Sequence, residues 1–295
     1  MIQLQDEILK PSLFPAGRTT WEFNSAEFPF VEVVSEILID AGILRSSVAL
    51  SESHLYISAE HRRPDPRTHD SMPTTLVSEA FRDDKSARAL YQKFIKKLSQ
   101  EVLGFDVLFQ AVPTFRFHFP ARILPDMRGP GGELLAYHFD QCFGDPFRQI
   151  NCWLPLTPCF GTNAMLVAGH EDSINILYDF CWRLKFDREL LWCSRKQMFE
   201  YLFEDSFFRT RTVASCSPLE TEFGCLHVFD GRFLHGTAEN VERATRVSAD
   251  FRLLAVEDYE CGVRSGIISL DAEQNDQSDR YVRGGFYDAK SAFEV

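Results

Sequence analysis

The sequence lacks the features that mark several specialised classes of protein. No window approaches about 18 consecutive apolar residues, so we expect no membrane-spanning helix and no membrane partner. Basic residues are outnumbered, with 31 Lys and Arg against 43 Asp and Glu, and a net charge of -12 argues against general nucleic-acid binding. The first residues hold no basic stretch followed by an apolar one, so we expect no secretory signal and a cytoplasmic location.

Closely paired cysteines are also lacking. The eight cysteines include no Cys-x-x-Cys motif, which predicts reduced, buried thiols of apolar character and no zinc site. Phenylalanine, by contrast, is abundant, with 27 residues among 295. Because burial of one such side chain contributes about 1.5–3 kcal/mol, the chain can close a large core.

The N-terminal part of the chain has the pattern of helices. Apolar residues recur at helical spacing over residues 30–44 and 86–103. The stretch between them, residues 60–84, is rich in Pro, Arg and Asp and predicts a long surface loop. Arg62 and Arg63 in this loop are either solvated charges or part of a lid that clamps an anionic substrate.

From Val107 onward the pattern changes to short strands separated by Pro and Gly. Such segments occupy residues 114–119, 149–156, 164–168, 225–229 and 246–256. Regular short strands predict a sandwich or barrel rather than alternating strands and helices. We therefore predict one domain over residues 1–295, divided into a mainly helical part (1–106), a β core (107–258) with a helical insertion near 172–208, and a C-terminal extension (259–295).

Histidine is scarce, and two of the eight histidines begin a His-x-Asp triplet, at His138 and at His170. On an extended segment, His138 and Asp140 leave the chain on the same face, and His235 follows far downstream. Two histidines and one carboxylate form the facial triad that holds Fe(II) and leaves positions open for other ligands. His170 and Asp172 with His235 are the competing set.

A row of polar residues follows His235 on a predicted strand. Arg246, Ser248, Asp250 and Arg252 alternate with other residues and so share one face. Because guanidinium groups bind carboxylates through two hydrogen bonds, Arg246 is predicted to anchor a carboxylate. Two alternatives stay open: Arg246 pairs with Asp250, or Arg252 is the anchor or a substrate contact.

With these motifs in this order, the sequence resembles the Fe(II)/2-oxoglutarate-dependent oxygenases, particularly the phytanoyl-CoA hydroxylase-like branch. The resemblance covers about residues 114–255, through YHFD, QINCWLPLTP, GTNAMLVAGHED, HGTAEN and the RVS that begins at Arg246. The chain departs at one turn, where Ala168-Gly169-His170 stands in place of the family's Pro-Gly-Ser-His. The resemblance is therefore to the branch and not to a finer subfamily.

The resemblance implies a mainly β fold with flanking helices and a double-stranded β-helix (jelly-roll) core. It implies Fe(II), 2-oxoglutarate and O2 as cofactor and cosubstrates, and oxidation of an unactivated C–H bond in a small metabolite or natural-product intermediate. The implied iron ligands are His138, Asp140 and His235; the implied 2-oxoglutarate residues are Arg246, Ser248, Thr237 and Trp153. Related halogenases have Gly or Ala in place of the carboxylate, so Asp140 favours a hydroxylation-type outcome.

Several residues retain two interpretations. Arg116 and His118 share one face of a predicted strand, where they either contact substrate, as Arg252 also would, or cap the edge of the barrel. His227 alternates with apolar residues and is expected to be hydrogen-bonded within the sheet. The alternative function is a cupin-like metal-binding isomerase or small-molecule binding module without oxygen chemistry. A third possibility is an inactive scaffold, against which the intact triad argues.

Overall fold

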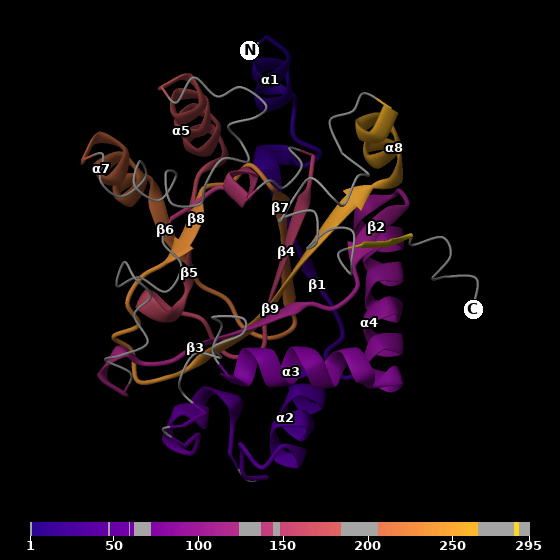
Figure 1. Cartoon of the computed structure of the whole chain (residues 1–295), viewed down its shortest axis with the longest axis vertical. Helices are drawn as coiled ribbons and strands as arrows, with labels where there is room; N and C mark the ends of the chain where they lie inside the picture. Colours follow the sequence, from indigo (N-terminus) through magenta and orange to yellow (C-terminus); the bar gives the residue numbers. More distant parts are fainter. Residues whose placement is uncertain are drawn as a thin grey trace.

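The computed structural model describes residues 2–46, 48–58, 60–61, 72–123, 137–143, 148–183, 206–264 and 286–288. Two antiparallel sheets lie at its centre (Figure 1). The larger sheet contains β1 (Arg18–Glu22), β7 (Cys225–Asp230), β4 (Ile150–Pro155), β9 (Arg246–Ala255), β2 (Val107–Gln110), β10 (Phe286–Asp288) and, also beside β9, β3 (Thr114–His118). The smaller sheet contains β6 (Cys216–Leu219), β5 (Met165–Ala168) and β8 (His235–Thr237).

The order of the strands is that of a jelly roll. Along the chain, β3, β4, β7 and β9 belong to the larger sheet, where they lie in the order β7-β4-β9-β3. The segment at His138, then β5, β6 and β8, form the smaller sheet, because His138 makes a bridge to His235 beside β8. The chain thus crosses repeatedly between two facing sheets, which confirms the predicted mainly β, double-stranded β-helix core.

Strand β9 has an apolar face on the outer side of the larger sheet and a polar face on the inner side. Its apolar residues, among them Val247 and Phe251, belong to the core on the outer side. Its polar residues lie on the opposite, inner side, where Arg246 and Arg252 line a pocket. Because side chains alternate along a strand, this single segment supplies both the apolar face that binds the helices and the polar face of the site.

Three helices cover the outer face: α2 (Phe30–Asp40), α3 (Met72–Asp83) and α4 (Lys85–Leu98). Aromatic pairs join them to the sheet, with ring centroids 5.1 Å apart for Trp21–Phe94, 5.2 Å for Phe81–Phe115 and 5.4 Å for Tyr91–Phe251. The carboxylate of Asp84 caps α4 by accepting the first backbone N–H groups of the helix. Many of the phenylalanines therefore serve to attach helices to the sheet.

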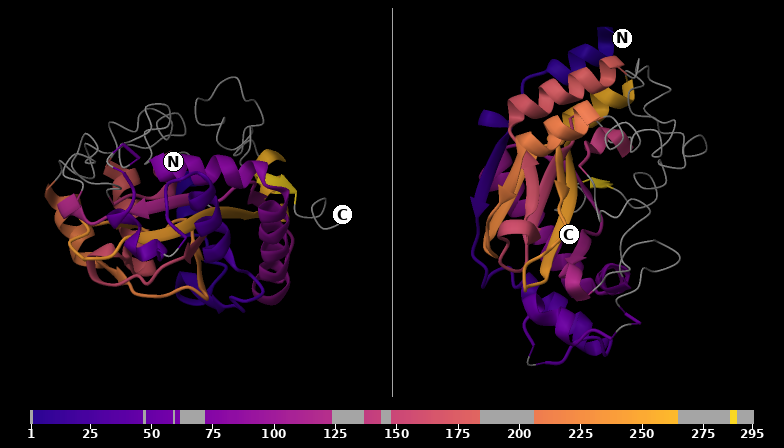
Figure 2. Two further views of the ribbon diagram at one scale, coloured as in Figure 1. Left: turned by 90° about the horizontal axis from the view of Figure 1, so that it is seen from below. Right: turned by 90° about the vertical axis from the view of Figure 1, so that its left-hand side faces the viewer.

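A second group of helices lies at the other end of the sheets (Figures 1 and 2). It comprises α1 (Ile2–Leu9), α5 (His170–Arg183) and α7 (Ser206–Ser215), which share a core containing Ile8, Phe180 and Phe208. Helix α8 (Val256–Arg264) follows β9 directly. Short helical turns occupy Pro15–Gly17, Leu50–Leu55, Ser99–Leu103, Ala121–Ile123, Asp140–Phe143 and Gly161–Asn163. No helix in the described part of the chain combines the length and apolar character needed to cross a membrane.

The structure corrects part of the predicted organisation. Residues 72–83 of the expected loop form α3, because Pro73 lies in the first helical turn, where proline is tolerated, and Val77 and Phe81 are buried. Residues 62–71, with Arg62 and Arg63, lie outside the described residues. Strand β1 lies in the part expected to be mainly helical, yet it pairs with β7.

The helix boundaries also differ from the predicted ones. Helix α2 ends at Asp40, four residues early, and α4 is followed by a π-helical turn that ends at Gly104, whose φ is 73°. The insertion expected near 172–208 contains α5 and the start of α7, while residues 184–205 lie outside the described residues. In both cases the apolar pattern continues past the last residue of the α-helix into the turn that follows, so the pattern alone overestimates the length of the helix.

Candidate metal centre

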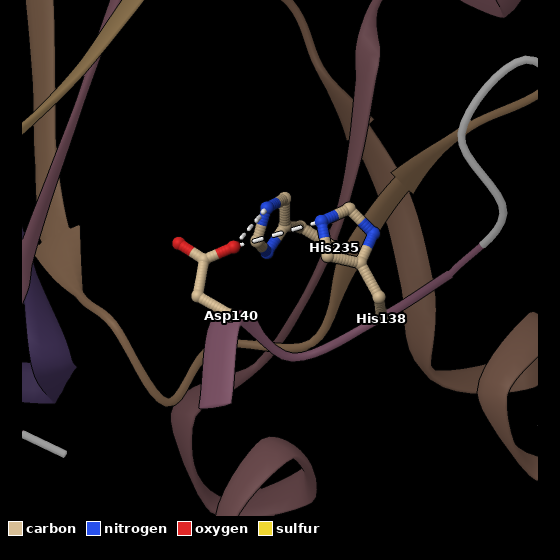
Figure 3. Close-up of side chains that lie close together, drawn as sticks. All are labelled: His138, Asp140 and His235. Atoms are coloured by element: carbon tan, nitrogen blue, oxygen red, sulfur yellow. Dashed lines mark ion pairs between the residues drawn. The ribbon is translucent and has the colours of Figure 1, made fainter. Parts of the chain in front are cut away.

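Three side chains from two distant segments of the chain converge: His138 and Asp140 from one, and His235 from the other (Figure 3). One ligand atom from each lies within 4.8 Å of the others, and all three residues are buried. Asp140 Oδ1 lies 3.6 Å from His138 Nε2 and 3.6 Å from His235 Nε2. Among the described residues this is the one group of His, Cys, Asp and Glu side chains with such an arrangement.

Backbone pairing brings the two histidines together. His138 N–H donates to His235 O at 2.8 Å, and His235 N–H donates to His138 O at 3.1 Å. Asp140 begins a short 3-10 turn, Asp140–Phe143, rather than continuing the extended segment. His138 and Asp140 therefore approach each other because a β-bridge at His138 is followed by a turn at Asp140. The uniformly extended segment that the sequence suggested is not formed.

His235 is oriented and kept neutral by its surroundings. Its Nδ1 lies 2.9 Å from Phe233 O, and a carbonyl can only accept, so Nδ1 carries the proton and Nε2 presents a lone pair to the cluster. Burial, together with the neighbouring His138, lowers the pKa of His235 to about 4. A neutral imidazole is the form that binds metal ions.

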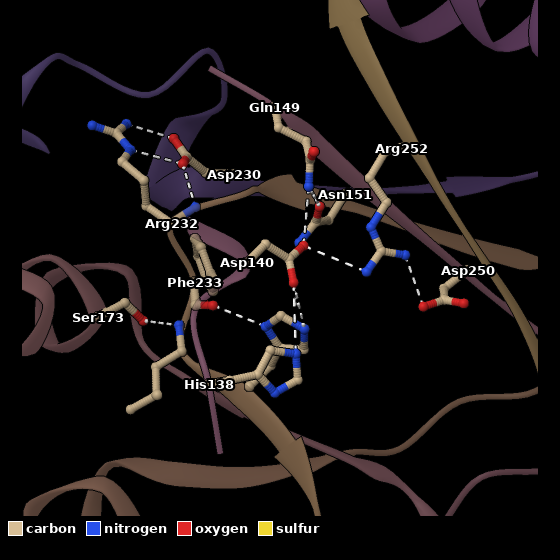
Figure 4. Close-up of polar contacts among 12 residues, drawn as sticks. His138, Asp140, Gln149, Asn151, Ser173, Asp230, Arg232, Phe233, Asp250 and Arg252 are labelled. Atoms are coloured by element: carbon tan, nitrogen blue, oxygen red, sulfur yellow. Dashed lines mark hydrogen bonds and ion pairs between the residues drawn. The ribbon is translucent and has the colours of Figure 1, made fainter. Parts of the chain in front are cut away.

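Asp140 is held through its other oxygen, Oδ2 (Figure 4). Gln149 Nε2 donates to Oδ2 at 3.1 Å, and Arg252 Nη2 lies 3.5 Å from it. Burial alone would raise the pKa of Asp140, but the charge of Arg252 and the contacts with the two histidines outweigh it and keep that pKa below its usual value. The carboxylate is thus ionised at neutral pH.

A pocket lies beside the three residues. It is partly open to solvent. Its lining includes residues from both sheets, among them His138, His235, Trp153, Met165, Thr237, Arg116, Arg246, Asp250 and Arg252. The pocket is therefore built from the inner faces of the sheets, with the histidines in its wall.

Arg246 is a buried cation with spare hydrogen-bonding capacity. Its side chain is 3% exposed, and Nε and Nη1 have no hydrogen-bond partner among the described residues. Burial lowers the pKa of Arg246 to about 10, so the guanidinium remains charged at neutral pH. Ser248 Oγ, on the same face of β9, is equally buried and without a described partner. Such groups are costly to bury unless a ligand satisfies them.

One alternative paired Arg246 with Asp250, but no hydrogen bond joins these two residues in the structure. Asp250 Oδ2 instead accepts from Arg252 Nη1 at 2.7 Å and from Arg116 Nε at 3.2 Å. Arg252 therefore bridges Asp140 and Asp250, and two carboxylates occupy its guanidinium. This arrangement favours Arg246 over Arg252 as the anchor for a ligand carboxylate.

The remaining candidates lie away from the cluster. His170 begins α5 and packs against Phe233, with ring centroids 5.5 Å apart, so the competing His170–Asp172 pair is not brought to His235. His227 lies near Thr20 Oγ1 (3.2 Å) and Thr221 Oγ1 (2.9 Å), as expected of a histidine bonded within the sheet. Burial and the charge of Arg246 lower the pKa of His118 to about 3.

Two residues of the site were not predicted from the sequence: Gln149 and Asn151. Both are buried on the inner side of β4 and its approach, and Gln149 Nε2 also donates to Asn151 Oδ1 at 2.9 Å. The alternation Gln149, Asn151, Trp153 was a signal that could have found them, because it places two amides on the same face as the tryptophan. Amides are common in proteins, however, and neither residue belongs to a known ligand pattern.

The donor set suits a divalent iron ion. Two imidazoles and one carboxylate match the facial triad of non-haem Fe(II) sites. In a facial set the donors lie at about right angles, so metal–ligand bonds of about 2.1 Å place each pair about 3 Å apart. Asp140 Oδ1 lies 3.6 Å from each histidine Nε2, so a small inward movement of the side chains brings the three atoms to that spacing. The residues therefore fit such an ion.

The fold and the site define a jelly-roll protein with a two-histidine, one-carboxylate cluster beside a pocket. No protein-family model matches the chain. The chain is 25% identical over 254 residues, 85% of its length and 92% of the relative's, to the streptomycin biosynthesis protein StrG of Streptomyces griseus.

Similar solved structures include non-haem iron proteins. EctD from S. alaskensis with bound Fe has a TM-score of 0.45 and 14% identity, covering 85% of this chain and 80% of EctD. SnoN, a non-haem α-ketoglutarate-dependent epimerase from nogalamycin biosynthesis, has a TM-score of 0.38 and 8% identity, covering 81% of this chain and 78% of SnoN.

Proposed function

We propose that the chain is an Fe(II)/2-oxoglutarate-dependent dioxygenase that hydroxylates, or otherwise oxidises, an unactivated C–H bond of a small molecule. In the same turnover 2-oxoglutarate is decarboxylated to succinate. The observation that carries the proposal is the convergence of His138, Asp140 and His235, all buried, beside a pocket whose wall contains both histidines and Arg246. The strand order supports it, because the three ligands occupy a jelly roll in the sequence order that the resemblance implies.

Each residue has a defined task in this proposal. His138, Asp140 and His235 would hold Fe(II), which together with 2-oxoglutarate and O2 supplies the oxidising chemistry. Arg246 would bind the distal carboxylate of 2-oxoglutarate through its unpartnered N–H groups, and Ser248 would donate to the same carboxylate. Trp153 and Thr237 line the same pocket and would restrict the cosubstrate to one orientation.

The chain's own contribution is orientation, charge and exclusion of water. The two sheets bury the ligands, so a charge placed among them is screened less than in water. Among the described residues that line the pocket, Arg246, Arg252 and Arg116 outnumber the one acid, Asp250, so this wall carries a net positive charge although the whole chain is acidic. This local charge suits a dianionic cosubstrate.

The proposed substrate class rests on one relative. The similarity to a streptomycin biosynthesis protein supports a natural-product intermediate as the substrate. A cupin-like isomerase or binding module would not need a second buried carboxylate anchor, so Arg246 and Ser248 favour the oxygenase.

The experiment that tests this proposal is an anaerobic titration with Fe(II) and 2-oxoglutarate. We expect a weak visible charge-transfer band that requires both components, because 2-oxoglutarate would chelate the ion. In chloride-free buffer the band should be lost in Asp140→Ala, since only two protein ligands remain and no halide takes the place of the carboxylate. A protein that binds Fe(II) without developing the band would contradict the oxygenase and favour the cupin-like alternative. Full metal affinity in Asp140→Ala would contradict the ligand assignment.

A further inference from the structure

The two oxygens of Asp140 have different surroundings. Oδ1 faces the two histidines, at 3.6 Å from each Nε2. Oδ2 faces away from them and receives the N–H of Gln149 at 3.1 Å and the cation of Arg252 at 3.5 Å (Figure 4). Asp140 is only 1% exposed, so water does not compete for either oxygen at the surface.

The amide of Gln149 is fixed in one orientation by its neighbours. Its Nε2 donates to the carboxylate of Asp140 and, at 2.9 Å, to Asn151 Oδ1. A carboxylate accepts and does not donate, so the nitrogen of Gln149 must face Asp140. Turning the amide over would place two oxygens against each other in a buried site, which is strongly unfavourable.

Arg252 reaches Asp140 from the neighbouring strand. Arg252 of β9 lies opposite Asn151 of β4 in the sheet register, and Gln149 directly precedes β4, so the two groups that contact Oδ2 come from neighbouring segments of the chain. Its Nη1 is bound to Asp250 at 2.7 Å, which anchors the guanidinium at one end while Nη2 faces Asp140. Asp140 itself belongs to the turn after His138, so the sheet holds a ligand that lies outside it.

We propose that Gln149 and Arg252 are positioning residues that make Asp140 a one-oxygen ligand. They occupy Oδ2, so that only Oδ1 is presented to the ion. On a six-coordinate ion, two histidines and one oxygen leave three positions open, whereas a carboxylate binding through both oxygens leaves two. The inference rests on the proposed function, because 2-oxoglutarate would take two positions and the third is then needed for O2.

The inference can be tested with Co(II) as an air-stable substitute for Fe(II). Gln149→Met keeps the size of the side chain but removes the donor, and Arg252→Met removes the cation. We expect each variant to bind Co(II) roughly 10- to 100-fold more weakly, the usual effect of losing a group that orients a metal ligand. We also expect the visible Co(II) spectrum to change, because Asp140 is then able to turn and bind through both oxygens. The affinity of the Co(II)-loaded variants for 2-oxoglutarate should also fall, because the second oxygen of Asp140 would take one of the three open positions and restrict how the cosubstrate can chelate the ion.

The matched control is Gln110→Met. Gln110 lies on the same sheet, is also partly buried, and donates to Thr114 Oγ1 at 3.2 Å, away from the cluster. It should match the wild type in Co(II) affinity, spectrum and 2-oxoglutarate binding. If either methionine variant fails to fold by its thermal transition, Arg252→Lys is the milder substitute. It keeps one charge but not the fork, and should show the same changes in smaller amplitude.

The outcomes separate this inference from the proposed function. A wild-type protein that binds no Co(II) would overturn the metal site and the proposed function with it. Wild-type Co(II) affinity and spectrum in folded Gln149→Met and Arg252→Met would overturn only the positioning role. Weaker binding with an unchanged spectrum and unchanged 2-oxoglutarate affinity would also overturn that role, because the two residues would then support the fold around Asp140 without setting how it binds.

Discussion

Three arginines lie on the inner side of the larger sheet, but only two of them contact an acidic side chain in the described part of this site. This difference indicates which arginine is available to bind a ligand. Arg116 and Arg252 both contact Asp250, and Arg252 also contacts Asp140. Arg246 has no such partner for its Nε and Nη1 among the described residues. Arg246 is thus the one of the three whose buried N–H groups lack a partner among the described residues, which suits it to an incoming carboxylate.

Replacement of Arg246 tests this assignment. Arg246→Ala is expected to weaken binding of 2-oxoglutarate to the Co(II)-loaded protein by about 10- to 100-fold, because a hydrogen-bonded charge contributes about 1.5–3 kcal/mol. Co(II) affinity should be unchanged, because the side chain of Arg246 orients none of the three ligands. Isothermal titration measures both. If Arg246→Ala left 2-oxoglutarate affinity intact and Arg252→Ala abolished it without loss of metal, Arg252 would be the anchor.

At the scale of elements, helix α1 is attached to the strand turn that leads to His235. Arg232 is fully buried, and its Nη1 donates to the carbonyl oxygens of Ile8 and Lys10 at 2.7 Å each and of Glu7 at 3.3 Å. Its other N–H groups bind Asp230 (Figure 4). One side chain thus caps the end of α1 and fixes the turn between β7 and β8.

Loss of this arginine should destabilise the protein strongly. Arg232→Met is expected to lower the free energy of unfolding by about 3–5 kcal/mol, because it leaves the Asp230 carboxylate buried without its partner. Urea unfolding followed by fluorescence would measure the change. The double variant Asp230→Asn/Arg232→Met should recover part of the loss, since the unpaired charge is gone. Equal stability of the single and double variants would show that the contacts with α1, and not the ion pair, account for the effect.

The elements differ in how well their sequences predicted them. Strand β9 was predicted with its two faces because alternation is a property of ten consecutive residues. Helix α3 was not, because its charged and hydroxyl residues resemble those of a loop. Thr74 and Thr75 are nonetheless buried, and Phe81 packs against Phe115 of β3. The helical state of this segment therefore depends on a neighbour more than thirty residues away in the chain.

For the molecule as a whole, partly or fully buried neutral histidines make the free energy of unfolding depend on pH. His227 connects β7 with β1 through Thr20, and burial, together with the charge of Arg18, lowers its pKa to about 4. In the unfolded chain an ordinary histidine takes up its proton near pH 6.5. Between about pH 6.5 and 4 the unfolded state therefore binds more protons, and the free energy of unfolding decreases as the pH falls.

We accordingly expect a lower melting temperature at pH 5 than at pH 7. His227→Gln keeps a donor and an acceptor for Thr20 and Thr221 but does not titrate, so its melting temperature should fall less over the same interval. Differential scanning fluorimetry at the two pH values measures both proteins. An identical pH dependence in the variant would assign the effect to other buried histidines, of which His118 has its pKa lowered to about 3.

The sequence by itself indicated a sandwich or barrel, and its resemblance to the oxygenase motifs indicated the residues of the candidate cluster. Alternation within a strand and the order of short motifs can both be read from the sequence without the folded structure. The same alternation predicts Arg246 and Ser248 on one face of their strand from the sequence alone.

Only the tertiary structure decided which partner each polar group meets. It paired Arg252 with Asp140 and Asp250, left Arg246 with unsatisfied N–H groups among the described residues, and brought Gln149 to the second oxygen of the carboxylate. These contacts join β4, β9 and the turn after His138, which come together through the register between strands. Because register is a relation between distant segments, no local pattern encodes it, and the division of roles among the arginines had to come from the folded chain.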